Sequence, residues 1–229
     1  IQIPIGEEDS FRGVIDLVEM KAVTWSDNEL GPPECGEIPE DMLATANDAR
    51  EHMVESLAEI DDEIAGKYLE GNELEVDELK RALRELTVSV KGVPVLAGSA
   101  LRNKGIEPLL DAIIDFLPSP QDMPPIEGVN PDTGEKEKRL PTEDDPFTAI
   151  AFKIVADPHA GKLAYFRVYS GSIEPGATVL NTTANKRERL TRVLRMHADE
   201  REEVKGSIRY GDILAAIGLR TANTGDTLS

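Results

Sequence analysis

The stretch at residues 93–105 (VPVLAGSALRNKG) constrains the fold of this 229-residue chain more than any other part of its sequence. Its first five residues form an apolar run, which predicts a buried strand over 93–97. Pro94 places that strand at the edge of a sheet, because proline cannot donate a hydrogen bond to a neighbouring strand. The tripeptide Ser-Ala-Leu at 99–101 then forms the turn that leaves the strand.

A helix follows this turn. Apolar residues recur at helical spacing from Ile106 to Leu117, and prolines at 118 and 120 end the pattern. A strand, a turn and a helix in this order are typical of an α/β sheet, in which the turn lies at the carboxyl edge of the strand. The apolar positions of the helix are Leu109, Leu110, Ile113, Ile114 and Leu117.

The turn at the end of the strand is a candidate for binding a guanine base. Its backbone N–H groups can donate hydrogen bonds to O6 of guanine, whereas adenine has no acceptor at that position. The candidate residues are therefore Ser99, Ala100 and Leu101. An ordinary strand-to-helix turn without a ligand explains the same residues, because Ser-Ala after an apolar run is common.

Several segments, spread from end to end, carry a resemblance to a known family. By these motifs, which occur in the same order and spacing, the chain is similar to bacterial elongation factor G, the translocation GTPase of protein synthesis. Ribosome-protection proteins and release-factor GTPases share some of the motifs, so both remain alternatives. The segments are residues 1–17, 98–105, 117–120, 147–171, 193–204, 211–219 and 224–228.

The nucleotide-binding motifs of that family are missing from these 229 residues. The sequence has no GxxxxGK[ST] phosphate loop, no Asn-Lys-x-Asp base reader, and no DxxG switch before the barrel. Such motifs hold the phosphates, the Mg²⁺ ion and the attacking water. We therefore expect a middle piece of a larger GTPase, whose whole chain binds GTP or GDP with Mg²⁺. These residues alone are expected to hold no cofactor and to contribute no catalytic residue. A self-standing, non-enzymatic protein-binding module is the alternative from another class.

The resemblance implies a multidomain fold with α+β and all-β parts. Residues 1–90 correspond to the α/β insert subdomain of the GTPase domain, and residues 91–121 to the last strand and helix of that domain. Residues 122–229 correspond to the second domain, a six-stranded translation-factor β-barrel, after a polar connection over 122–145. The strands expected in the barrel are 147–155, 162–170, 178–181, 189–197, 213–218 and a last one near Thr227.

The first part combines short strands with helices. The strands are expected at 1–5, 12–16 and 21–25. One helix, possibly with a break, is expected from residue 39 or 40 to 69, and a second at 75–85.

The negative charge of the chain is concentrated in this first part. Residues 1–90 hold 24 acidic and 7 basic residues, whereas residues 122–229 hold 17 and 15. An acidic block is repelled by RNA phosphates and attracted to basic protein surfaces. In elongation factor G, the acidic helix of the insert contacts the ribosomal stalk protein. A solvated helix face explains the same acids. The residues that match that contact are Glu55, Glu59, Asp62 and Glu63.

The resemblance also implies that the barrel touches small-subunit rRNA. Strand alternation sends the basic side chains near its middle to both faces, so they cannot all form one patch. A solvated surface, salt-bridged with Glu188 and other acids, is the explanation that the sequence favours. These basic residues are Lys186, Arg187, Arg189, Arg192 and Arg195.

The remaining composition narrows the class of protein. Cys35 is the one cysteine, so no intrachain disulfide can form, which fits a reducing cytoplasm. No apolar run approaches the ~20 residues of a membrane span. His52, His159 and His197 share no metal-ligand spacing with each other or with the cysteine, so no metal site is expected. The expected partner is the ribosome in the cytoplasm, with neither a membrane nor DNA.

Overall fold

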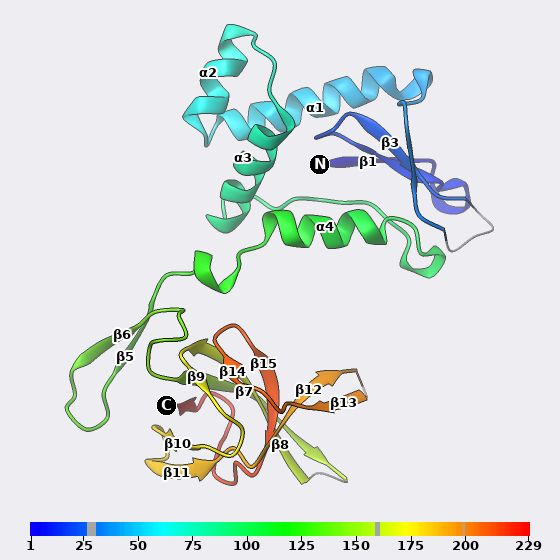
Figure 1. Cartoon of the computed structure of the whole chain (residues 1–229). Coiled ribbons are helices and arrows are strands. Elements are labelled where there is room, and N and C mark those ends of the chain that lie inside the picture. Colours follow the sequence, from blue (N-terminus) through cyan, green and yellow to red (C-terminus); the bar gives the residue numbers. More distant parts are fainter. Residues whose placement is uncertain (27–30, 159–160, 199) are drawn as a thin grey trace. The chain divides into compact units, whose positions relative to one another are not determined.

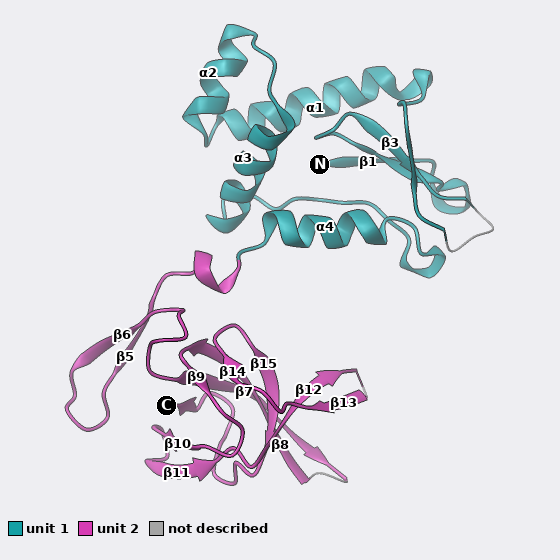
Figure 2. Ribbon diagram, in the orientation of Figure 1, with its two compact units in different colours: residues 1–118 teal, residues 119–229 magenta. Residues whose placement is uncertain are grey.

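The computed structural model describes residues 1–26, 31–158, 161–198 and 200–229. They form two compact units, residues 1–118 and residues 119–229 (Figures 1 and 2). Residues 91–118 lie in the same unit as residues 1–90. The assignment of 1–90 to an insert subdomain and of 91–121 to the end of a GTPase domain stays a prediction.

A four-stranded antiparallel sheet opens the first unit, with its strands in chain order. The first three strands were predicted from the sequence, but β4 was not, because all three of its residues are exposed and show no apolar alternation. Gly13 lies on β2 opposite Thr24 of β3. A Cβ atom there would be 2.3 Å from the carbonyl oxygen of Val23. The strands are β1 (Gln2–Ile5), β2 (Gly13–Asp16), β3 (Lys21–Thr24) and β4 (Glu34–Gly36).

Three helices follow the sheet, where two were predicted (Figure 1). The long helix expected up to residue 69 is broken, because Asp61 has an extended backbone and its side chain caps a new helix. That helix ends at Gly71, whose left-handed backbone (φ +70°) suits glycine. The elements are η2 (Glu40–Met42), α1 (Leu43–Ala58), α2 (Asp62–Glu70) and α3 (Val76–Val88).

Two apolar clusters hold this unit together. The first half of α1 covers the sheet, with Ala46 buried against residues of β1, β2 and β3. The second half packs with α2, α3 and the last turn of α4 (Ile106–Phe116), where Leu57, Ile64 and Leu79 are fully buried. The sheet and the helices α1, α2 and α3 therefore form one packed structure. The strands and the helices each turn their apolar side chains toward it, as their apolar spacing of two and of 3.6 residues predicts.

The strand predicted over 93–97 is wrong. These residues have no strand geometry, and no described strand pairs with them. Their contacts are a bond of 3.3 Å from the amino terminus of Ile1 to the carbonyl oxygen of Val95 and one of 3.4 Å from the amide of Ala97 to Gln2 Oε1. An extended segment becomes a strand only when a neighbour supplies a hydrogen-bonded ladder, and none is at hand among the described residues.

The second unit begins with η4 (Pro120–Asp122) and a hairpin of β5 (Ile126–Val129) and β6 (Lys136–Arg139). The sequence predicted a polar connection here and no strands, so the hairpin is new. A turn at residues 131–133 joins these two strands. Asn130 stabilises it, because its side-chain oxygen accepts hydrogen bonds from the amides of Asp132 and Thr133.

An eight-stranded antiparallel sheet forms the rest of the second unit, in the order β11-β10-β16-β7-β8-β15-β12-β13. It curves around one core, since β7, β8, β10, β12, β15 and β16 all contribute to the same buried cluster. The strands are β7 (Thr148–Asp157), β8 (Gly161–Ser170), β10 (Thr178–Asn181), β11 (Lys186–Arg189), β12 (Arg192–His197), β13 (Glu200–Glu203), β15 (Ile213–Ile217) and β16 (Thr227–Leu228), with β9 (Ser172–Ile173) and β14 (Ile208–Arg209) as a separate pair.

The expected six strands are therefore too few. The single strand predicted over 189–197 is two strands, interrupted at Leu190 and Thr191. β9 and β14 have two residues each, and all four residues of β13 are charged and exposed. Such strands carry no apolar alternation that a sequence pattern could reveal. None of the helices described here is both long and apolar enough to cross a membrane.

Candidate functional site

The loop at residues 98–105 is closed by its own backbone. The amide of Ser99 donates to the carbonyl oxygen of Lys104 at 2.8 Å, and the amide of Lys104 donates back to Ser99 at 3.0 Å. Side chains would not fit where the two ends approach, since a Cβ atom at Gly98 would lie 2.9 Å from the Lys104 oxygen. Asn103 turns the chain with a left-handed backbone (φ +52°), which asparagine tolerates better than most residues.

The candidate base-binding residues lie at the tip of this loop. Ser99 precedes a single 3-10 turn, η3 (Ala100–Arg102). The amides of Ala100 and Leu101 donate to no residue that the structure describes, and the side chain of Leu101 is 97% exposed. The loop thus leaves two adjacent backbone donors available to a ligand, as the predicted contact with a purine oxygen requires.

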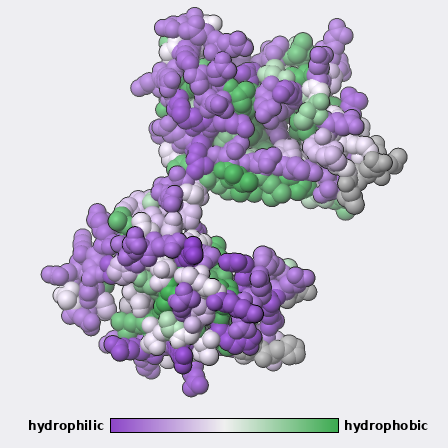
Figure 3. Space-filling view, in the orientation of Figure 1, coloured by the Kyte–Doolittle hydropathy of each residue, from purple (hydrophilic) through white to green (hydrophobic). Residues whose placement is uncertain are grey.

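An exposed apolar surface accompanies this loop in the first unit. Helix α4 forms as predicted, but it packs with Ala112 and Phe116, and its predicted apolar positions stay exposed. Figure 3 shows apolar residues along α4 on the face in view. Val93 (81% exposed) and Val95 (69%) add to the exposed apolar residues of the unit. The exposed residues of α4 and its end are Leu109, Leu110, Ile113, Ile114 and Leu117.

This surface predicts low local stability. We expect the amide hydrogens of residues 93–97 and of α4 to exchange with solvent much faster than those of β7 and β8, because the segment has no ladder and the helix buries one side only. Native-state hydrogen exchange on a dilute monomer measures the difference. Equal protection of residues 93–97 and of β8 would contradict it.

The four acidic candidates come from two helices. Glu55 lies in α1, Glu59 follows its last residue, and Asp62 and Glu63 open α2. All four are exposed. Glu59 and Glu63 do not project from adjacent turns of one helix, since the chain leaves the helical conformation at Asp61.

Two of these carboxylates already have partners. Glu55 accepts a hydrogen bond of 3.1 Å from the hydroxyl of Tyr68 and lies 3.3 Å from Nδ1 of His52. Glu63 forms an ion pair of 3.0 Å with Arg81 of α3. The negative field of the four residues is therefore partly neutralised at Glu63, which the sequence pattern did not indicate.

Asp61 and Arg81 connect α2 to α3. Oδ1 of Asp61 accepts hydrogen bonds from the amides of Glu63 and Ile64, and Oδ2 accepts one of 2.9 Å from Arg81. Burial raises the pKa of Asp61, but the amides and Arg81 outweigh it, so its pKa lies below the usual range. An aspartate between two apolar runs is an N-cap signal, so the sequence could have revealed the break.

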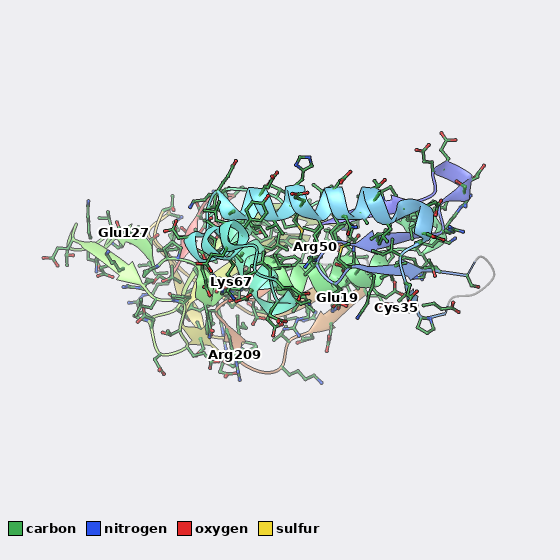
Figure 4. All side chains as sticks on the ribbon, turned by 90° about the horizontal axis from the view of Figure 1, so that it is seen from above. Glu19, Cys35, Arg50, Lys67, Glu127 and Arg209 are labelled. Atoms are coloured by element: carbon green, nitrogen blue, oxygen red, sulfur yellow. The ribbon has the colours of Figure 1, made fainter. Side chains whose placement is uncertain are left out.

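The position of α1 on the sheet is fixed by Arg50. Its guanidinium donates hydrogen bonds to the carbonyl oxygens of Leu17 and Val18, at the end of β2. Figure 4 labels this side chain beside α1. Partial burial lowers the pKa of Arg50 and nearby Asp16 opposes that effect, but arginine stays charged.

The five candidate basic residues of the second unit lie on β11 and β12 and are all exposed. Two have acidic partners: Arg192 is 2.9 Å from Glu203, and Arg195 is 3.4 Å from Asp212. Acidic partners are therefore present at two of the five candidate positions. Glu188 does not take part, because it is buried and accepts a hydrogen bond from the amide of Thr221.

No group of three or more His, Cys, Asp or Glu side chains among the described residues could hold a metal ion. Cys35 is exposed on β4 and forms no disulfide. His159 lies outside the residues that the structure describes.

Comparison with known proteins shows what the two units resemble. Residues 161–229 match the family model of Elongation factor Tu domain 2. The chain is 52% identical over 228 residues to elongation factor G of Thermotoga maritima, which covers 100% of this chain. Along its whole length, the chain is similar to elongation factor G. It spans 33% of that relative, about a third of its length.

A solved structure is also similar to this chain over its full length. A crystal structure of a protein from Thermus thermophilus superposes with a TM-score of 0.75 and 26% sequence identity, and it covers 100% of this chain and 31% of its own. The resemblance to elongation factor G seen in the sequence motifs is thereby confirmed. The match to the second domain of elongation factor Tu falls in the sheet of the second unit, as expected for a translation-factor barrel.

Proposed function

We propose that this chain is part of a translational GTPase of the elongation factor G type, which promotes the movement of tRNA and mRNA during polypeptide elongation. The identity of 52% to elongation factor G over 228 residues carries the proposal. That identity extends through both units, which disfavours a ribosome-protection protein, a release factor or a self-standing binding module. GTP hydrolysis would belong to the whole protein, working in the cytoplasm, because the phosphate and switch motifs are not among these residues.

Two assays on the full-length protein that carries this chain test the proposal. We expect GTP hydrolysis that ribosomes stimulate, and a three-nucleotide advance of the ribosome on mRNA after GTP is added to pretranslocation complexes. Stimulated hydrolysis without that advance would contradict elongation and favour the ribosome-protection or release-factor alternative. Absence of stimulated hydrolysis would overturn the GTPase proposal.

Within the whole protein, Ser99, Ala100 and Leu101 would contact the guanine base of GTP or GDP. The two amides without acceptors in the described structure support this role. The phosphates and Mg²⁺ would be held by motifs outside the 229 residues.

Two contacts with the ribosome follow from the same proposal. The acidic residues Glu55, Glu59, Asp62 and Glu63 would dock on a basic surface of the stalk protein, and their exposure supports this role. The second unit would contact small-subunit rRNA. The exposed arginines of β11 and β12 are available for phosphates, although the ion pairs of Arg192 and Arg195 compete with that contact.

Reversing charge on α1 is expected to weaken stalk binding. Glu55→Lys combined with Glu59→Lys changes two exposed carboxylates four residues apart, and it leaves the ion pair of Glu63 intact. Exposed ion pairs contribute about 0.2–1 kcal/mol each, so affinity should fall several-fold. The loss should appear mainly in the association rate and fade with salt.

The control keeps the same change in net charge away from the candidate surface. Glu40→Lys combined with Asp41→Lys alters two acids of η2 that are also exposed. Association of each double variant with the isolated stalk domain would be measured at low and near-physiological salt. Equal association rates for both variants at low salt would favour a merely solvated helix face.

A further inference from the structure

The connection between β1 and β2 accepts hydrogen bonds from two side chains of the candidate base-binding loop at 98–105. Arg102 donates two hydrogen bonds to Asp9, one of 3.0 Å from Nη1 to the carbonyl oxygen and one of 2.6 Å from Nη2 to Oδ1. Lys104 donates one of 3.3 Å from Nζ to the carbonyl oxygen of Phe11. Both donors belong to the loop at 98–105, and both acceptors belong to one six-residue stretch, 7–12.

That connection is itself constrained. Glu7 and Ser10 bond to each other three times: the amide of each donates to an oxygen of the other, and the Ser10 hydroxyl donates to the carbonyl oxygen of Glu7. Gly6 enters it with φ +86°, where a Cβ atom would lie 2.1 Å from the Ser10 carbonyl oxygen. The acceptors on Asp9 and Phe11 are therefore presented by a fixed turn.

The two anchors flank the candidate base contact. Arg102 directly follows Leu101, and Lys104 forms the backbone bridge with Ser99. Lys104 is 2% exposed, so its anchor is part of the packed interior. The side chain of Arg102 is 39% exposed and that of Asp9 is fully exposed, so this anchor can be removed without opening the core.

We propose that Arg102 and Asp9 are positioning residues for recognition of the guanine base, acting through the loop that presents Ala100 and Leu101. The inference rests on the proposed function. Two backbone donors discriminate a base only if they are held where its acceptor lies. A loop released from its anchor must be ordered when the base binds, and this ordering costs conformational entropy. The cost weakens the hydrogen bonds to O6 of guanine more than the contacts made by the rest of the nucleotide.

The test compares GDP with the diphosphate of 2-aminopurine riboside, which has hydrogen in place of O6. Dissociation constants for both would be measured on the full-length protein for Asp9→Ala, Arg102→Ala and the double variant. The affinity for GDP should fall about two- to five-fold in each single variant, as expected for one exposed ion pair. Affinity for the analogue should change less. The double variant should match Arg102→Ala, because Asp9→Ala removes only the side-chain bond, whereas Arg102→Ala also removes the bond to the carbonyl oxygen.

Two variants separate positioning from a general loss of folding. Asp9→Asn keeps an Oδ1 acceptor for Arg102 and should restore most of the preference for GDP. Asp41→Ala removes an exposed acid of the same unit that lies in η2, and it should leave both affinities unchanged.

The outcomes distinguish this inference from the function on which it rests. Equal binding of GDP and the analogue by the wild-type protein would overturn the base contact itself. A wild-type preference that Asp9→Ala and Arg102→Ala leave intact would overturn the positioning role alone. Reduced preference in these variants, with rescue by Asp9→Asn, supports it.

Discussion

Phe166→Ala is expected to lower the free energy of unfolding of the second unit by about 3–5 kcal/mol. The ring lies on β8, belongs to the buried cluster to which six strands of that unit contribute, and is fully buried. Its removal loses the transfer free energy of the ring and leaves a cavity that the curved sheet cannot close. Denaturant-dependent hydrogen exchange of the amides in β7 and β8 measures this loss locally.

A second phenylalanine provides the matched control. Phe152 lies on the neighbouring strand β7, is 44% exposed, and its only ring contact among the described residues is Tyr165, at 6.3 Å between centroids. Phe152→Ala should cost below about 1 kcal/mol. Similar costs for the two substitutions would mean that the curved sheet does not enclose a core at Phe166.

Asp61→Ala is expected to destabilise the first unit by about 2–4 kcal/mol. It removes the cap of α2, worth about 0.5–2 kcal/mol, together with a charged hydrogen bond from Arg81, worth about 1.5–3 kcal/mol. Urea unfolding of the purified chain measures the change. Asp62→Ala, which changes the exposed neighbour, should cost a few tenths of a kcal/mol. Equal effects at the two positions would contradict a role for the cap.

The same residue predicts a pH dependence. The pKa of Asp61 is lowered in the folded chain, so its stabilisation is complete above the unfolded pKa of about 3.9 and is lost as the pH falls through the lower folded value. Asp61→Asn keeps a capping side chain but cannot ionise. The stability difference between wild type and this variant should therefore be constant near neutral pH and shrink below about pH 4. A difference independent of pH would show that the charge contributes nothing.

Much of the architecture was accessible from residue patterns. Helices α3 and α4 and the long strands β7 and β8 were predicted, because each is long enough to show a complete apolar period. Short strands such as β4 and β13 were missed, since three or four exposed residues carry no period. The break at Asp61 was left open because the apolar spacing continues across it, although an aspartate at this point is an N-cap signal.

The candidate sites were also predicted only in part from the sequence. The sequence motifs singled out Ser99, Ala100 and Leu101 as a possible base contact. Their anchors could not be inferred, because Asp9 and Arg102 are 93 residues apart and meet only in the folded unit. The partner of Glu63 is likewise 18 residues away, on another helix. Long-range ion pairs leave no local pattern in a sequence.

The sequence by itself determined the resemblance to elongation factor G, the α+β and all-β character of its parts, and most of the longer elements. These properties depend on motif order and on apolar periods, both of which are local. Only the tertiary structure decided that 93–97 is not a strand here, that α4 exposes its apolar positions, and how the 98–105 loop is held. A strand needs a neighbour, burial needs a covering surface, and an anchor needs a distant partner, so each depends on what the folded chain brings alongside.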